Sequence, residues 1–118
     1  MLTTSPLAID VRDTGTTRHL TLAGDLDIGT APAAHQAVSD AARSHADTIV
    51  LDLTALEFAD ACAVHLVLTL HQAATEAGQR LVVLPGPPWV HDVFRLTGTD
   101  ERLPFARTTG RFGPQRPA

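Results

Sequence analysis

The residues most capable of chemistry lie in the stretch EFADACAVHLVL, residues 57–68. It holds the only cysteine of the chain, Cys62, with Asp60 two residues before it and His65 three residues after it. A thiol close to a cation or to a helix dipole can act as a nucleophile, and His65 is the nearest candidate base. No third group that would orient the imidazole is identifiable. Three interpretations of Cys62 therefore stay open: a small residue at a helix start, a catalytic thiol, or part of a regulated contact surface.

A helix is predicted from about Ala61 to Ala77, with Asp60 as its N-cap and Gly78 as its stop. At about 100° per residue, one side of this helix is polar and the other apolar. The polar side holds Cys62, His65, Thr69, Gln72 and Glu76, and the apolar side holds Ala63, Leu66, Val67, Leu70 and Ala74. We therefore expect Cys62 to be exposed or partly exposed. The first turn of such a helix also favours negative charge, because its backbone N–H groups are free.

The strands that position this helix follow from the pattern on either side of it. Residues 7–13 and 18–24 alternate apolar and other residues around the turn TGTT, which predicts an antiparallel hairpin. The run 48–53 predicts a central strand covered on both faces, and the run 80–85 predicts a second buried strand. Strand, helix and strand in this order form a βαβ unit. The sequence thus predicts an α/β fold with a mixed sheet, an N-terminal antiparallel hairpin, and helices packed on the sheet.

Further elements complete this domain. A helix is expected from Thr30, its N-cap, to near His45, and its apolar face would hold Ala34, Ala37, Val38 and Ala41. The stretch PGPPWVHDVFRLTG predicts a short third helix, and residues 103–105 predict a last short strand. We expect one domain over residues 1–106, followed by a flexible tail over residues 107–118.

Composition excludes several classes of function. The formal net charge is −4, and the nine basic residues, all arginine, are scattered along the chain, so we expect no nucleic-acid partner. A single cysteine excludes an internal disulfide, and no spacing of cysteine and histidine predicts a metal site; His19, His35, His45, His71 and His91 are expected to be solvated. The chain shows no signal-peptide pattern and no apolar run of about 20 residues, so we expect a cytoplasmic protein without direct membrane insertion.

Two motifs in the order found here resemble the STAS domain of bacterial anti-sigma factor antagonists. The first is similar to the family's Gly-x-Leu-Asp-x-x-Thr signature, in the segment LAGDLDIGTAPAAHQAV: Gly24, Leu26, Asp27 and Thr30. The second, IVLDLTALEFADACAVHLVLTLHQAATEAGQRLVVL, resembles the family's strand, its loop with Phe-x-Asp-Ser-Ser-Gly, and its helix. The resemblance extends over residues 7–105.

The resemblance implies a non-catalytic protein-interaction module that needs no cofactor. Its partner would be an anti-sigma factor, often also a serine kinase, and binding would release a sigma factor and so regulate transcription. In the family, phosphorylation of a serine at the start of the central helix breaks that complex, because it adds about −1.5 to −2 charges to the contact surface. Here Ala61 and Cys62 stand at the two serine positions and Ala63 at the glycine. We therefore predict a binding surface without its usual phosphorylation switch.

The predicted partner-binding residues come from both motifs and from the polar side of the central helix. They are Asp25, Asp27, Thr30, Glu57, Asp60, Cys62, His65 and Thr69. For Asp25 and Asp27 a local role in shaping the turn is an equal alternative. A homodimer is a further option.

Two other functions remain as alternatives. STAS domains also serve as accessory subunits of membrane transport systems or as parts of stress-sensing assemblies, and the fold alone does not separate these roles. The alternative of another class is a thiol enzyme or redox sensor based on Cys62, which would require a depressed thiol pKa.

Overall fold

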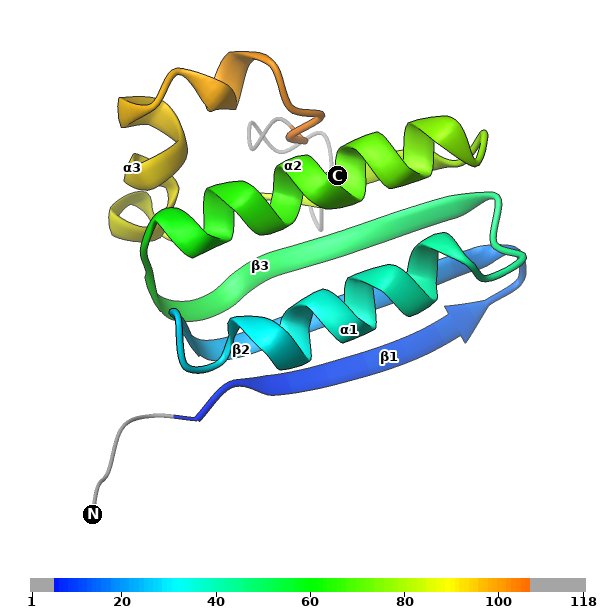
Figure 1. Cartoon of the computed structure of the whole chain (residues 1–118), viewed down its shortest axis with the longest axis horizontal. Helices are drawn as coiled ribbons and strands as arrows, with labels where there is room; N and C mark the ends of the chain where they lie inside the picture. The colour runs from blue at the N-terminus through cyan, green and yellow to red at the C-terminus, as the bar shows by residue number, and fades with distance from the viewer. Residues whose placement is uncertain (1–5, 107–118) are drawn as a thin grey trace, which may run out of the picture.

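The structure, a computed structural model, describes residues 6–106 and contains one four-stranded sheet with helices packed against it (Figure 1). The predicted flexible tail, residues 107–118, lies outside the described residues. The elements in chain order are β1 (Ala8–Thr14), β2 (Thr17–Leu26), α1 (Ala31–Ala42), β3 (Thr48–Ala59), α2 (Ala61–Glu76), β4 (Arg80–Leu84), α3 (Pro88–Leu96) and the 3₁₀ turn η1 (Thr99–Glu101).

The sheet is mixed, as the sequence predicts. Its strand order is β1-β2-β3-β4, with β1 antiparallel to β2 and the other neighbours parallel. The hairpin joins Thr14 to Thr17 through a two-residue turn in which Gly15 has a φ of 60°. Glycine suits this left-handed backbone because it carries no Cβ. Both β2-α1-β3 and β3-α2-β4 are βαβ units, one more than the sequence pattern identified.

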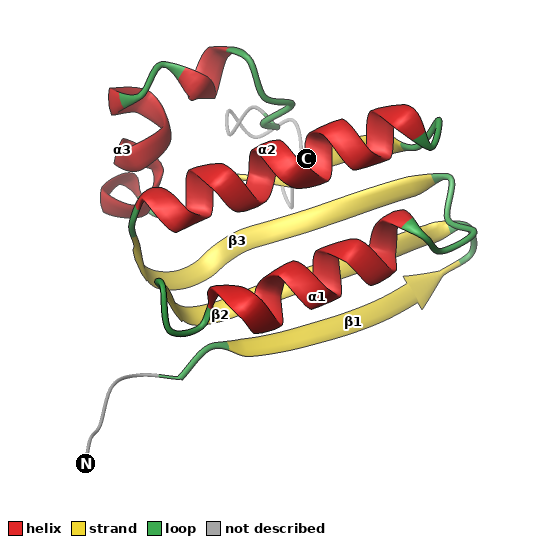
Figure 2. Ribbon diagram, viewed as in Figure 1, coloured by secondary structure: helices red, strands yellow, loops and turns green. Residues whose placement is uncertain are grey.

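Helices α1 and α2 lie side by side against the same face of the sheet (Figure 2). The strand 48–53 was expected to be covered on both faces, and this expectation is wrong: Ile49 and Leu51 are buried under the helices, while Val50 and Asp52 on the other face are partly exposed. The reason is topological. Both crossovers step in the same direction along the sheet, and because crossovers are right-handed, both helices fall on one side.

One hydrophobic core fills the space between the sheet and the helices. Helix α2 contributes its predicted apolar side, since Ala63, Leu66, Val67, Leu70 and Ala74 are all buried. Helix α1 contributes Ala34, Val38 and Ala41. Among residues 6–106, no helix combines the length and the apolar character that crossing a membrane requires.

Strand β3 is longer than the sequence indicates, because it runs through to Ala59. Its pairing with β2 contains register shifts, and a bulge of this kind interrupts the alternation by which a strand is recognised in sequence. Asp52 lies within β3 and accepts hydrogen bonds from the backbone N and the hydroxyl of Thr54, which fits a structural role. The predicted strand at 103–105 is reduced to an isolated bridge between Phe105 and Val83.

Candidate protein-interaction surface

The first motif forms the loop between β2 and α1, and its hydrogen bonds divide its residues into two roles. The Asp27 carboxylate accepts from the backbone N–H groups of Gly29 (3.0 Å) and Thr30 (3.1 Å). The Thr30 hydroxyl donates to the carbonyl oxygen of Asp25 (2.8 Å) and accepts from the backbone N of Asp27 (3.0 Å). Asp27 and Thr30 therefore shape the loop, while the carboxylate of Asp25 takes no part in these hydrogen bonds.

Thr30 occupies the N-cap position of α1, as predicted, but its side chain does not cap the helix. Its hydroxyl is engaged by Asp25 and Asp27 instead. The helix begins with proline in its first turn, where a missing N–H costs nothing.

Gly24, the first residue of the motif, is required by a close approach of the chain. Its φ is 107°, and a Cβ built on it would lie 2.3 Å from the carbonyl oxygen of Pro6. Any other residue would displace the segment that enters β1, so the motif glycine is explained by packing and backbone conformation together.

The second motif lies directly beside the first. In the parallel pairing of β2 with β3, Asp25 is opposite Phe58 and Leu26 is opposite Ala59. The backbone N of Asp60 also donates to the carbonyl oxygen of Leu26 at 3.3 Å. The two motifs, more than 20 residues apart in sequence, therefore form one surface at the carboxyl ends of the parallel strands. We call residues 25–30 and 57–62 the loop surface.

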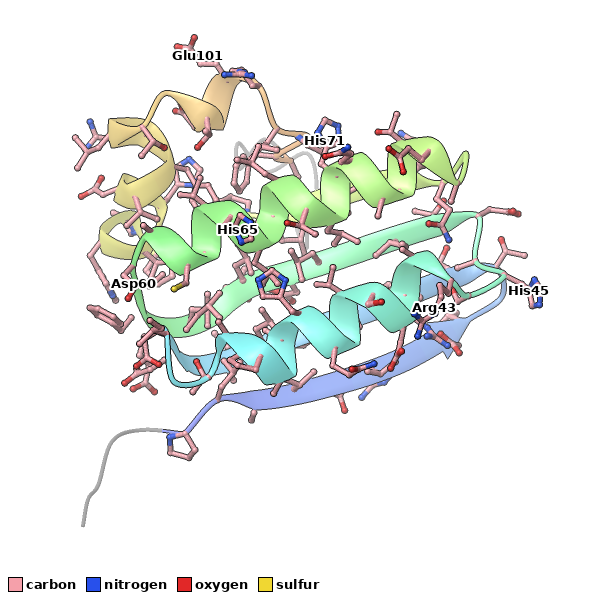
Figure 3. The ribbon with its side chains drawn as sticks, in the orientation of Figure 1. Arg43, His45, Asp60, His65, His71 and Glu101 are labelled. Atoms are coloured by element: carbon pink, nitrogen blue, oxygen red, sulfur yellow. The ribbon has the colours of Figure 1, made fainter. Side chains whose placement is uncertain are left out.

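Asp60 is the N-cap of α2, as the sequence predicts. Its backbone is extended, and its Oδ1 accepts from the backbone N of Cys62 at 2.8 Å (Figure 3). This bond satisfies one of the free N–H groups of the first turn and places a carboxylate at the positive end of the helix.

Cys62 is a partly buried residue in that first turn. Burial raises the pKa of its thiol, and the neighbouring carboxylates of Asp60 and then Asp27 raise this pKa further. A thiol that stays protonated is a poor nucleophile, so the geometry does not support the catalytic or redox alternative. The ring of His65 lies close to that of His35 on α1, with ring centroids 5.3 Å apart and the ring planes tilted by 53°.

The other residues predicted on α2 lie on its exposed side. His65 and Thr69 are exposed, and the Thr69 hydroxyl donates to the carbonyl oxygen of His65 at 2.8 Å. The pairing of His65 with His35 was not anticipated from sequence, since the two residues lie on different helices. It does not make a metal centre by itself: residues 6–106 contain no group of three or more histidine, cysteine, aspartate or glutamate side chains placed to hold a metal ion.

Three large apolar side chains at this end of the sheet are exposed, and sequence reasoning did not count them as site residues. Ile28 is 81 % exposed, Phe58 48 % and Trp89 64 %. Trp89 comes from α3, and its indole N–H donates to the carbonyl oxygen of Glu57 at 3.0 Å, which attaches α3 to the loop surface. The sequence feature that could have pointed to Trp89 is that it is the single tryptophan of the chain and directly follows two prolines. Exposed aromatic side chains of this kind are frequent anchors of protein interfaces.

The charge of the loop surface is unbalanced. Within residues 6–106, the ion pairs involve Asp10, Asp13, Asp40 and Asp92. None of the four carboxylates of the loop surface, Asp25, Asp27, Glu57 and Asp60, takes part in them. The loop surface therefore presents net negative charge around exposed apolar side chains.

Comparison with known proteins agrees with this geometry. Residues 9–105 match the family model of the Mlab STAS domain. The chain is a member of the STAS family. Among curated proteins, sequence comparison finds no match to this STAS domain.

Solved structures show the same fold. An anti-sigma factor antagonist from Mycobacterium paratuberculosis is 25 % identical, with a TM-score of 0.74 and 87 % of each chain covered. The anti-sigma factor antagonist SpoIIAA in its unphosphorylated form is 24 % identical, with a TM-score of 0.71, and the likeness covers 86 % of this chain and 90 % of that one. A STAS domain protein from Planctomyces limnophilus is 15 % identical, with a TM-score of 0.70 and coverages of 86 % and 91 %. The STAS domain thus has anti-sigma factor antagonists as structural neighbours over most of its length.

Proposed function

We propose that this STAS domain is a cytoplasmic, non-catalytic binding module that binds an anti-sigma factor of the serine-kinase type and so regulates sigma-factor-dependent transcription. Support comes from the 25 % identical antagonist, which matches over 87 % of the chain, and from the absence of an activated nucleophile at Cys62.

The observation that carries the proposal is the joining of the two motifs into one acidic surface that also exposes large apolar side chains. Phe58 lies opposite Asp25 in the sheet, and Trp89 is hydrogen-bonded to Glu57. An interface of this composition would bind through its aromatic side chains, while its unpaired carboxylates would steer a basic partner and fix its orientation. The exposed side of α2, with His65 and Thr69, extends this surface.

The two positions of the proposed surface that correspond to the family's serines carry no hydroxyl group. Ala61 is exposed and Cys62 is partly buried at the positions of the family's two serines. A phosphate there would place about −1.5 to −2 charges beside the Asp60 carboxylate, where like charges repel each other and the added charge would be costly to desolvate in an interface. With no hydroxyl at positions 61 and 62, binding would not be interrupted in this way, and control would rest on the amounts of the two proteins.

Titration calorimetry of the full chain with the kinase-like anti-sigma factor of its host tests the proposal. We expect a complex that Cys62→Asp weakens roughly tenfold or more, about 1.4 kcal/mol, because it places a carboxylate at a partly buried position of the contact, where desolvating the charge is costly. Glu57→Lys should weaken it similarly. Glu101→Lys is the matched control, because Glu101 lies on η1, away from the loop surface (Figure 3). Absence of binding, or equal affinities for wild type and Cys62→Asp, would refute the proposed surface.

A kinase assay tests the missing switch separately. Incubation with the anti-sigma factor and ATP should leave the wild type unmodified, while Cys62→Ser should gain one phosphate by mass spectrometry. Stoichiometric phosphate on the wild-type loop surface would contradict the interpretation, even if the complex itself forms.

A second candidate function is kept because the match to the Mlab STAS domain model shows the family and does not by itself decide the role. In this role the domain would be an accessory subunit of a membrane transport system, using the same loop surface. Co-purification with a transporter ATPase from the host, in place of a soluble kinase-like protein, would favour this second role.

A further inference from the structure

Strand β1 is the outer strand of the sheet, at its lower edge in Figure 1. Within residues 6–106, it pairs with β2 on one side and with no strand on the other. Its middle residue, Val11, is 50 % exposed, which is high for a large aliphatic side chain in a strand. An open edge of this kind is a template for pairing with another strand.

The hairpin determines which backbone groups of β1 point outward. Thr14 and Thr17 close a two-residue turn, and such a pair exchanges both of its backbone hydrogen bonds. Because hydrogen-bonded and non-hydrogen-bonded pairs alternate, the even-numbered residues of β1 bond to β2. The N–H and C=O groups of Ile9, Val11 and Asp13 are then directed away from the sheet.

The centre of β1, Asp10-Val11-Arg12, is complementary in charge to an antiparallel copy of itself. An antiparallel copy related by a two-fold axis through Val11 overlaps the whole seven-residue strand. In this register the outward groups of Val11 meet those of the second Val11, and the outward groups of Ile9 meet those of Asp13. Asp10 of each copy then lies opposite Arg12 of the other copy. These two pairs are close non-hydrogen-bonded pairs, with Cα atoms about 4.5 Å apart.

We infer that β1 pairs with β1 of a second copy of this chain in an antiparallel, two-fold symmetric dimer centred on Val11. The side chains that would form the two intermolecular ion pairs are available, because Asp10 is 63 % and Arg12 74 % exposed, with only a 3.8 Å contact between them in one chain. Asp13 would lie opposite Ile9, but its carboxylate is already held by two hydrogen bonds from Arg18, at 2.8 Å and 3.0 Å.

Charges on an edge strand usually prevent association, and here they select one register. Shifting the axis by one residue toward the N-terminus places Asp10 opposite Asp10, and shifting it toward the C-terminus places Arg12 opposite Arg12. Like charges directly opposite each other are destabilising. The dimer edge also differs from the loop surface, so the inference does not depend on the proposed function.

Sedimentation analysis of the full chain over a range of concentrations tests the dimer. We expect a reversible dimer whose dissociation constant rises at least roughly tenfold in Asp10→Arg, and likewise in Arg12→Asp, because each change replaces two attractions by two repulsions. Mixing the two single variants should restore dimers, since each then supplies the charge the other lacks. Glu101→Arg changes the net charge as Asp10→Arg does but lies away from β1, and it should dimerise like wild type.

Three results of these measurements would overturn the dimer. A wild type that stays monomeric up to about 1 mM overturns the inference. So does a dimer whose affinity is unchanged by the single variants, or a mixture of the two variants that remains monomeric. Far-UV circular dichroism of each variant confirms that its fold is retained, which is expected because both side chains are exposed.

Discussion

Replacement of Asp60 tests how the helix start at the loop surface is built. In Asp60→Ala the 2.8 Å hydrogen bond from the backbone N of Cys62 is lost, and the helix has no N-cap side chain. Loss of such a cap costs about 1 kcal/mol, within a range of about 0.5–2 kcal/mol. Loss of the carboxylate from the positive end of the helix adds about 0.3–1 kcal/mol. We therefore expect Asp60→Ala to lower the free energy of unfolding by about 1.5 kcal/mol.

Asp60→Asn is the matched control, because asparagine caps helices as well as aspartate does. It retains the hydrogen-bond acceptor and removes only the charge, so it loses only the smaller contribution of the carboxylate at the positive end of the helix. We expect its free energy of unfolding to remain within about 0.5 kcal/mol of the wild type. The pKa of the Cys62 thiol should fall in this variant, since the Asp60 charge raises it, but only in part, because burial is the larger cause.

Urea denaturation followed by circular dichroism measures the stabilities, and the pH dependence of iodoacetamide alkylation reports the thiol. A loss of about 1 kcal/mol corresponds to about 4 °C in Tm for a domain of this size, so thermal unfolding gives an independent value. The reasoning fails if Asp60→Asn is as destabilising as Asp60→Ala, or if its thiol pKa equals that of the wild type.

Three further predictions concern Gly24, the thiol of Cys62 in the wild type, and the pair of Asp13 with Arg18. Gly24→Ala should destabilise the domain by at least about 2 kcal/mol, because its Cβ would meet the Pro6 carbonyl oxygen at 2.3 Å; a urea midpoint equal to that of wild type would contradict this. Cys62 in the wild type should react with iodoacetamide at pH 7 more slowly than free cysteine, since its thiol pKa is raised above its ordinary value of 9.0, and a faster reaction would restore the thiol-enzyme alternative. The Arg18 guanidinium lowers the pKa of Asp13 below its ordinary 3.8, so this pair stabilises the hairpin above that pH and the contribution is lost as the pH falls through the lowered value. The free energy of unfolding should therefore decline less steeply below pH 3.8 in Asp13→Asn than in wild type. Identical pH profiles of the two proteins would exclude this pair as a source of acid sensitivity.

Local features of this protein could be predicted from sequence because they depend on neighbouring residues. The N-cap role of Asp60 and the two sides of α2 follow from residue type and helical spacing, and the structure confirms them. The hairpin around Gly15 follows from alternation and turn composition in the same way. The bulged continuation of β3 to Ala59 could not be recognised, because a bulge breaks the alternation that identifies a strand.

Contacts between residues from distant segments could not be predicted from the sequence. Trp89 joins the loop surface through a hydrogen bond to a residue 32 positions earlier, and His35 meets His65 across two helices. Neither contact has a local pattern.

The sequence by itself determined the acidic loops, the missing hydroxyl groups at Ala61 and Cys62, and the amphipathic helix between them and β4, because each is a property of a short segment. The tertiary structure decided that both helices cover one face, that the two loops form one surface, and that β1 has an open edge. These depend on the handedness of two crossovers and on strand register, which arise only when distant segments pack against each other.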